Sequence, residues 1–221
     1  MASGTRRGRT KNHRVTDFDG AKSAVIRVGH GRGFVVEGKA DRFVITAAHC
    51  LPRFPPCATI SYPEERTYRS LLGPLGKKTT VWAECLFADP IGDIAVLGSP
   101  DNQKFIEQAE HYEAMVDEVV PLSVSEGPPE GPAWLLSLDG RWFQCKVEYE
   151  YEFDGPYWIS ELAEKIRGGM SGSPILAKNR SAIGIVCSGV VSDGEPVDTG
   201  PEPRLSRNLP GWIWRDLNGL S

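Results

Sequence analysis

The sequence predicts an all-β protein built from two lobes. Glycine (24) and proline (17) are plentiful among the 221 residues and are spread along the chain, which suits short strands joined by turns. Short apolar runs bounded by such turns recur in both halves, and one longer segment shows helical spacing. The hydrophobic content of 40% and the charged content of 24% are ordinary globular values that allow a sizeable core.

The first half of the chain has the pattern of a β lobe. Residues 29–33 and 38–41 are predicted turns, and residues 47–51 form a helical turn that Pro52 stops. The predicted strands cover residues 24–28, 34–37, 42–46, 58–61, 79–87 and 93–97.

A connector and a second β lobe follow. Residues 103–118 carry apolar side chains at helical spacing, which predicts a helical or irregular connector. Asp139-Gly140 predicts a hairpin between strands 134–138 and 142–152. Pro210 in the first turn supports a C-terminal helix. Further strands are expected at 157–160, 174–177 and 182–191. The predicted parts are a tail (1–19), a first lobe (20–100), a connector (101–118) and a second lobe with the terminal helix (119–221).

Charge and cysteine content limit the possible partners. A net charge of −4 gives no indication of a nucleic-acid partner. The odd cysteine count of 5, with no CxxC pair, argues against a disulfide framework or a zinc site, and we expect no cofactor. No apolar run predicts a membrane span or a signal peptide, so we expect a cytoplasmic protein. We expect residues 1–14, which are basic, to be a disordered, solvated tail, with an acidic partner as the alternative.

The stretch Gly-Gly-Met-Ser-Gly-Ser-Pro at 168–174 is a candidate nucleophile turn. Glycines on both sides of Ser171 permit a sharp turn that exposes a hydroxyl and aims several backbone N–H groups at one point. An attacking serine and an oxyanion hole both need that arrangement. The alternative is an ordinary Gly/Ser/Pro loop.

A base and a carboxylate to serve Ser171 can be found upstream. Among the four histidines, His49 alone follows a buried-looking strand, and Asp93 opens another apolar strand. Taken singly, such a histidine is more often a core residue and such an aspartate a turn or capping residue. A nucleophilic serine, however, needs an imidazole to take its proton and a carboxylate to orient that imidazole. The order His49, Asp93, Ser171 is the order of the chymotrypsin arrangement.

These motifs resemble those of the chymotrypsin-like (trypsin-fold) serine proteases. Thr-Ala-Ala-His-Cys at 46–50 resembles the family's histidine motif, and Asp-Ile-Ala-Val-Leu at 93–97 is similar to its aspartate motif. Gly-Met-Ser-Gly-Ser-Pro at 169–174 is similar to the nucleophile motif, and residues 184–189 resemble the strand that follows it. The resemblance covers about residues 20–217.

The resemblance implies a fold and a set of roles. Ser171 would be the nucleophile of a serine endopeptidase, His49 its general base and then acid, and Asp93 the orienting carboxylate. The N–H groups of Gly169 and Ser171 would form the oxyanion hole. Backbone at Cys187, Ser188 and Gly189 would bind an extended protein or peptide substrate. Two six-stranded antiparallel β-barrels and a C-terminal helix would carry these groups, with the site between the barrels.

The sequence also departs from the animal trypsins. Cys50 has no upstream cysteine to pair with, and Met170 occupies the position of the aspartate that binds a newly cut N-terminus. The chain therefore looks closer to bacterial trypsin-like peptidases without a PDZ domain, and we expect no activation by N-terminal cleavage. Without that kind of activation, an activating or inhibiting protein partner could control the proteolytic activity. Lys165 lies six residues before Ser171, where the trypsins carry an aspartate, so specificity stays open.

Two other functions were weighed against a peptidase. The first is a catalytically inactive protease-like domain that binds peptides or a partner protein. The second is an esterase of the α/β-hydrolase type, which needs Gly-x-Ser-x-Gly and the order Ser, Asp, His. Gly169 and Ser173 stand at the flanking offsets and the order differs, so the esterase is the weaker hypothesis.

Overall fold

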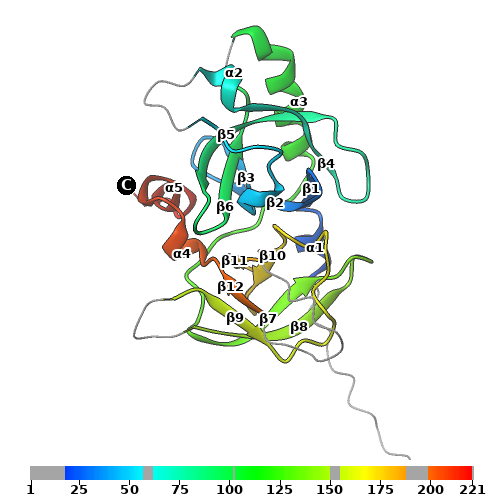
Figure 1. Cartoon of the computed structure of the whole chain (residues 1–221), viewed down its shortest axis with the longest axis vertical. Coiled ribbons are helices and arrows are strands. Elements are labelled where there is room, and N and C mark those ends of the chain that lie inside the picture. The colour runs from blue at the N-terminus through cyan, green and yellow to red at the C-terminus, as the bar shows by residue number, and fades with distance from the viewer. Residues whose placement is uncertain (1–17, 57–61, 102, 150–154, 188–198, 221) are drawn as a thin grey trace, which may run out of the picture.

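Two β lobes make up the molecule, with short helices at their edges (Figure 1). The computed structural model describes residues 18–56, 62–101, 103–149, 155–187 and 199–220. The predicted tail at 1–19 therefore lies largely outside the described residues, and the predicted strand at 58–61 lies wholly outside them.

The first lobe is a closed six-stranded barrel. Its strands follow the order β1-β2-β3-β6-β5-β4, and every neighbouring pair is antiparallel. Alternate residues of each strand point inward and form an apolar core that includes Val35, Val44, Leu72 and Leu97. The six strands are β1 (Val25–Val28), β2 (Gly31–Glu37), β3 (Arg42–Thr46), β4 (Thr67–Pro74), β5 (Val81–Asp89) and β6 (Ile94–Gly98).

The second lobe has six strands in the order β11-β10-β7-β8-β9-β12. An antiparallel bridge between Gly184 and Arg204, with a hydrogen bond from Ile185 N–H to Pro203 O, brings β11 to the chain just after β12. This contact closes the sheet into a second barrel. The strands are β7 (Glu130–Leu136), β8 (Trp142–Glu148), β9 (Tyr157–Ser160), β10 (Pro174–Leu176), β11 (Ala182–Ile185) and β12 (Thr199–Glu202). The predicted fold of two six-stranded antiparallel barrels is therefore confirmed.

Helices connect and flank the barrels. The predicted connector is helical over most of its length, and the C-terminal helix α5 begins directly after Pro210, as expected. Within the described ranges, no helix has the length and apolar character that a membrane crossing requires. The helical segments are α1 (Asp19–Lys22), η1 (Ala48–Cys50), α2 (Pro63–Arg66), η2 (Gln103–Phe105), α3 (Ile106–Asp117), α4 (Leu205–Asn208) and α5 (Gly211–Leu217).

Several element predictions were wrong in extent or missing. The turn predicted at 29–33 ends at residue 30, because β2 begins at Gly31 and its first four residues, 31–34, pair with β1. The hairpin strand β8 and strand β11 end at Glu148 and Ile185, earlier than predicted. The structure also contains α1, α2, α4, β4 and β12, which the sequence pattern does not predict.

The two barrels share an apolar core at their junction. This core contains Phe34 and Ile45 from the first lobe, Leu176 and Ile185 from the second, and Ile213 from α5. The segment between α3 and β7 pairs first with β2, through Val36 and Leu122, and then with β11, through Val124 and Ala182. Burial of this shared apolar surface holds the barrels at a fixed relative position.

Candidate active site

His49 and Asp93 lie at the adjacent ends of two paired strands. His49 sits in η1, directly after β3, and Asp93 directly precedes β6. Because β3 and β6 are antiparallel neighbours, with Thr46 opposite Ala95, these two ends meet. The structure therefore brings together two residues that are 44 positions apart in the chain.

The Asp93 carboxylate engages His49 through both of its oxygens. His49 Nδ1 lies 2.7 Å from Asp93 Oδ2, and the backbone N–H of His49 donates to Oδ1 at 2.9 Å. An ionised carboxylate only accepts hydrogen bonds, so the contact favours the tautomer with the proton on Nδ1. That tautomer leaves the Nε2 lone pair available as a base. The side chain of His49 is 48% exposed, so a substrate can reach the ring.

The backbone of Asp93 is turned to permit this contact. Its φ of 50° lies in the left-handed region, which aspartate tolerates better than most residues. The carbonyl of Asp93 accepts from Ala48 N–H at 3.1 Å and from Cys187 Sγ at 3.2 Å. The main chain of Asp93 is thereby fixed by both lobes while its carboxylate faces the imidazole.

Ser171 lies in a tight loop of the second lobe. Met170 N–H donates to Arg167 O at 3.1 Å, and Ser173 N–H donates to Met170 O at 2.9 Å. Gly172 N–H then joins the loop to Val186 O, just after β11, at 2.6 Å. The Met170 side chain is 1% exposed and packs into the core of the second barrel, which anchors the loop from below.

The Ser171 loop docks against the first lobe beside His49. The carbonyl of Ser171 accepts from Arg32 N–H at 2.7 Å and from Cys50 Sγ at 3.7 Å, and Cys50 is the residue after His49. The approach is so close that a Cβ on Gly172 would lie 1.9 Å from Arg32 O, and a Cβ on Gly31 would lie 2.7 Å from Ser171 O. Glycine at these two positions therefore permits the contact between the lobes.

The predicted oxyanion donors have free backbone N–H groups. Within the described residues, neither Gly169 N–H nor Ser171 N–H donates a hydrogen bond to another protein group. Gly169 has a φ of 90°, a conformation that favours glycine. Two unpaired N–H groups on one exposed turn can bind an anionic oxygen.

Of the three predicted substrate-binding residues, only Cys187 is described, and Ser188 and Gly189 lie outside the described residues. The N–H of Cys187 donates to the buried carboxylate of Glu202, so this N–H is already occupied. An extended peptide at this position could therefore form a backbone hydrogen bond only to the carbonyl of Cys187. Sequence reasoning missed Glu202, because β12 carries no apolar pattern that would reveal a strand.

A cavity of about 460 Å³ adjoins Asp93 and Cys187. Its lining includes Pro156, Pro201 and Pro203, and the side chain of Ile91, which also lines it, is almost fully exposed. Its described lining residues are Asp89, Ile91, Gly92, Asp93, Gly155, Pro156, Cys187, Pro201, Pro203, Arg207 and Asn208. The cavity therefore lies next to Asp93, which contacts His49.

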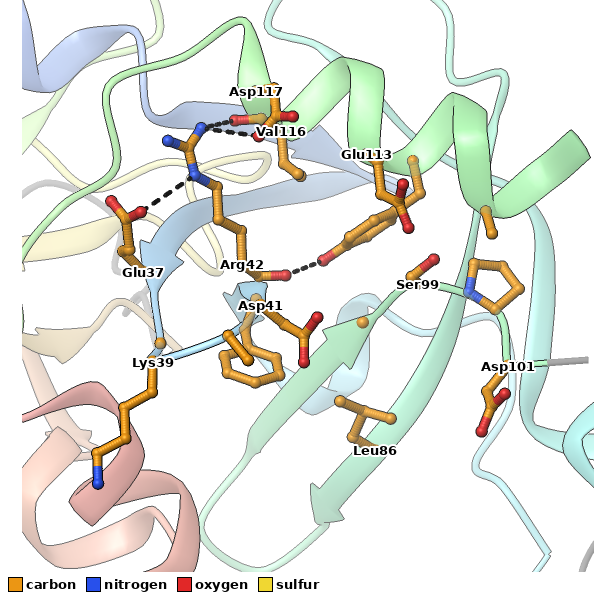
Figure 2. A pocket seen from close by; sticks show the side chains of 17 residues that line it. Glu37, Lys39, Asp41, Arg42, Leu86, Ser99, Asp101, Glu113, Val116 and Asp117 are labelled. Atoms are coloured by element: carbon orange, nitrogen blue, oxygen red, sulfur yellow. Dashed lines mark hydrogen bonds and ion pairs between the residues drawn. The ribbon is translucent and has the colours of Figure 1, made fainter. Parts of the chain in front are cut away.

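The residues considered for specificity lie at the surface. Lys165 and Glu161 are exposed, and Glu164 pairs with Arg141 at 2.9 Å. A separate cavity of about 750 Å³, between the 37–43 turn and α3, contains none of the predicted site residues (Figure 2).

Burial keeps the two thiols near the site, Cys50 and Cys187, in their weakly nucleophilic protonated form. Burial raises the pKa of Cys50 to about 11, and it also raises the pKa of Cys187 far above the ordinary value. Both thiols are therefore protonated near neutral pH. Among the described residues, Cys50, Cys85, Cys145 and Cys187 are all free, and no group of three or more His, Cys, Asp or Glu side chains could hold a metal.

The comparisons with known proteins are distant. No protein-family model matches the chain, and no curated protein matches it. Solved structures do match, among them the Rv3671c protease in an inactive form (16% identity, 79% of this chain and 82% of that chain, TM-score 0.48). Another is the NSP4 proteinase from Equine Arteritis Virus (15% identity, 80% and 70%, TM-score 0.48). A third belongs to a study of coupled folding and binding of the disordered Sesbania mosaic virus VPg protein (15% identity, 75% and 78%, TM-score 0.49).

The chain's own strand pairing defines its structural class. Two six-stranded antiparallel barrels in sequence, followed by a C-terminal helix, make up the trypsin-like fold.

Proposed function

We propose that this protein is a serine endopeptidase that cleaves protein or peptide substrates. The observation that carries the proposal is the pairing of His49 with Asp93 at 2.7 Å, beside a loop that holds Ser171 against the residue after His49. A serine needs such a base and carboxylate to attack a carbonyl.

In the proposed acylation step, Ser171 Oγ attacks the scissile carbonyl carbon while His49 Nε2 takes the hydroxyl proton. Asp93 keeps Nδ1 protonated and stabilises the imidazolium that forms. The carbonyl oxygen becomes an oxyanion, which the N–H groups of Gly169 and Ser171 bind. A donor of this kind contributes about 3 kcal/mol to the transition state. The C–N bond then breaks, and the imidazolium gives its proton to the leaving amine.

Deacylation repeats these steps with water as the nucleophile. His49 takes a proton from the water, the hydroxide oxygen bonds to the acyl carbon, and a second oxyanion forms in the same site. The bond to Ser171 Oγ then breaks, and the imidazolium returns the proton to the serine. The products are a carboxylic acid, an amine and the original enzyme, so no cofactor enters the proposed reaction.

A proteome-derived peptide library tests this function. Wild-type protein and Ser171→Ala are incubated side by side, and new N-termini are identified by mass spectrometry. We expect cleavage with the wild type and none with Ser171→Ala, and the aligned sites give the side-chain preference. Equal cleavage by both proteins would overturn the proposal. An uncut library together with tight peptide binding by both proteins would favour the binding domain instead.

A further inference from the structure

Arg32 is a charged residue buried at the junction of the two lobes. It lies between Gly31 and Gly33 in β2 and is 3% exposed. Its backbone is fully used, because its N–H donates to Ser171 O and its carbonyl accepts from Thr46 Oγ1 at 2.6 Å. Arg32 therefore contacts the Ser171 loop even before its side chain is considered.

The side chain of Arg32 crosses from the first lobe into the second. Nη1 donates to Leu136 O at 2.6 Å, and Nη2 donates to Ser137 O at 2.9 Å. Nη1 also lies 3.4 Å from Oγ of Ser173, two residues after the proposed nucleophile. Binding of two successive carbonyls uses the rigid, forked donors of a guanidinium, which a lysine ammonium cannot reproduce.

The partners of this guanidinium are dipoles rather than a countercharge. No carboxylate in the described part of the chain lies within ion-pair distance of Arg32, and burial lowers its pKa. A buried charge without a counterion is costly and persists only when fixed dipoles satisfy it. The two carbonyls and the hydroxyl are therefore held tightly to the guanidinium, since their loss would leave the charge unsolvated.

These partners lead directly to the proposed oxyanion hole. Leu136 and Ser137 open the β7–β8 hairpin turn, where Gly140 N–H donates back to Ser137 O at 3.1 Å. The next residue of that turn, Leu138, is 3.7 Å from the position a Cβ on Gly169 would occupy. Arg32 thus fixes the hairpin turn that lies against Gly169. It also contacts Ser173, two residues after Ser171.

We propose that Arg32 is a positioning residue that holds the Gly169–Ser171 turn in register with His49. The role rests on the proposed function, because it concerns the geometry of the same site. Arg32 does not contact the reacting atoms. It acts through the β7–β8 turn and Ser173, so its loss should displace the oxyanion donors while leaving the cavity next to Asp93 intact.

Arg42 offers a matched control at a distance from the site. It also ties backbone carbonyls together, with Nη1 donating to Val116 O at 2.7 Å, and it pairs with Glu37 and Asp117 (Figure 2). Arg42→Gln therefore removes a comparable cross-link between β3 and α3. A general loss of rigidity would affect both variants, whereas a positioning role is specific to Arg32.

The test measures kinetics and hydrogen exchange in wild type, Arg32→Gln, Arg32→Lys and Arg42→Gln. For Arg32→Gln we expect kcat to fall about 10- to 100-fold with less than about a threefold change in KM, because small displacements of reacting groups cost this much. Amide exchange should rise at 136–141 and 168–173. Arg32→Lys should recover part of kcat and provides a folded variant if the glutamine disrupts folding. Arg42→Gln should keep kcat and raise exchange only near 116–119.

The outcomes separate the two proposals. Unchanged kcat and unchanged exchange at 168–173 in both Arg32 variants would overturn the positioning role while the peptidase stands. If Arg32→Gln selectively raises exchange at 136–141 and 168–173 while the wild-type protein cleaves no substrate, the Arg32 contact stands as a positioning device and the peptidase is rejected.

Discussion

His49 and Asp93 are joined by two hydrogen bonds to different oxygens of one carboxylate, one from the imidazole and one from the backbone N–H of His49. The backbone contact fixes the carboxylate, and the ring contact fixes the imidazole. The pair is therefore oriented before any substrate binds.

Asp93→Asn tests the tautomer that this pair imposes. The asparagine oxygen can still accept from His49 N–H, but its amide then points an N–H donor at Nδ1. The proton moves to Nε2, which can no longer accept from Ser171. We expect kcat/KM for a cleaved peptide to fall about 10³- to 10⁴-fold with little change in melting temperature. Asp101→Asn, a change at an exposed carboxylate at the start of the connector, serves as the control. An Asp93→Asn protein with near wild-type activity would contradict the proposed role.

Gly172→Ala tests the close approach of the lobes. Gly172 has a φ of 82°, and a Cβ there would meet Arg32 O at 1.9 Å, so the loop must move away from β2. Gly168→Ala is a matched control in the same loop, because a Cβ there meets nothing within 4 Å. We expect Gly172→Ala to lose activity and lower the urea midpoint, and Gly168→Ala to stay near wild type. Equal activity and equal urea midpoints in the two variants would contradict this expectation.

Met170→Ala tests the anchoring of the Ser171 loop in the second barrel. The side chain is almost fully buried among apolar residues, so its removal should lower the free energy of unfolding by about 2–5 kcal/mol. Met170→Leu, which keeps the volume, should cost less than about 1.5 kcal/mol. Chemical denaturation measures both. A Met170→Ala protein as stable as the wild type would show that this side chain does not anchor the loop.

We expect Asp139 to make a pH-dependent contribution to the free energy of unfolding. Hydrogen bonds from Ser137 and Arg141 hold the pKa of this exposed carboxyl at about 2, below its ordinary value of 3.8. Because the folded-state pKa is the lower one, this stabilisation is present above pH 4 and is lost as the pH falls towards 2. In Asp139→Asn the denaturation midpoint should fall less between pH 4 and pH 2 than it does in the wild type, and the difference should be clearest at low salt. An unchanged slope would remove Asp139 from this account.

Strands with regular burial could be predicted from the sequence, and irregular ones could not. The predictions at 42–46 and 157–160 coincide with β3 and β9, whose apolar runs are short and uninterrupted. Strand β4 was missed because a register shift between Tyr68 and Leu72, with Ser70 at a φ of 51°, breaks the alternation of buried and exposed residues. Strand β12 was missed because its sequence, Thr-Gly-Pro-Glu, resembles a turn.

The residues of the site could be predicted to different degrees. His49, Asp93 and Ser171 lie in motifs whose residue types and order indicate the proposed chemistry. Arg32 could not be found in this way, since a charged residue between two glycines is typical of a surface turn. Its burial depends on contacts with Leu136 and Ser137, more than 100 positions later in the chain. Only the packed structure of both lobes reveals such a contact.

Covalent labelling with a fluorophosphonate tests the central claim most directly. Intact, folded wild-type protein is treated near neutral pH, and the adduct is located by mass spectrometry. We expect one adduct on Ser171 Oγ, formed as fluoride leaves, with labelling lost in Ser171→Ala and strongly slowed in His49→Ala. Unlabelled wild-type protein, or equal labelling of Ser171→Ala, would contradict the assignment of Ser171 as an activated nucleophile.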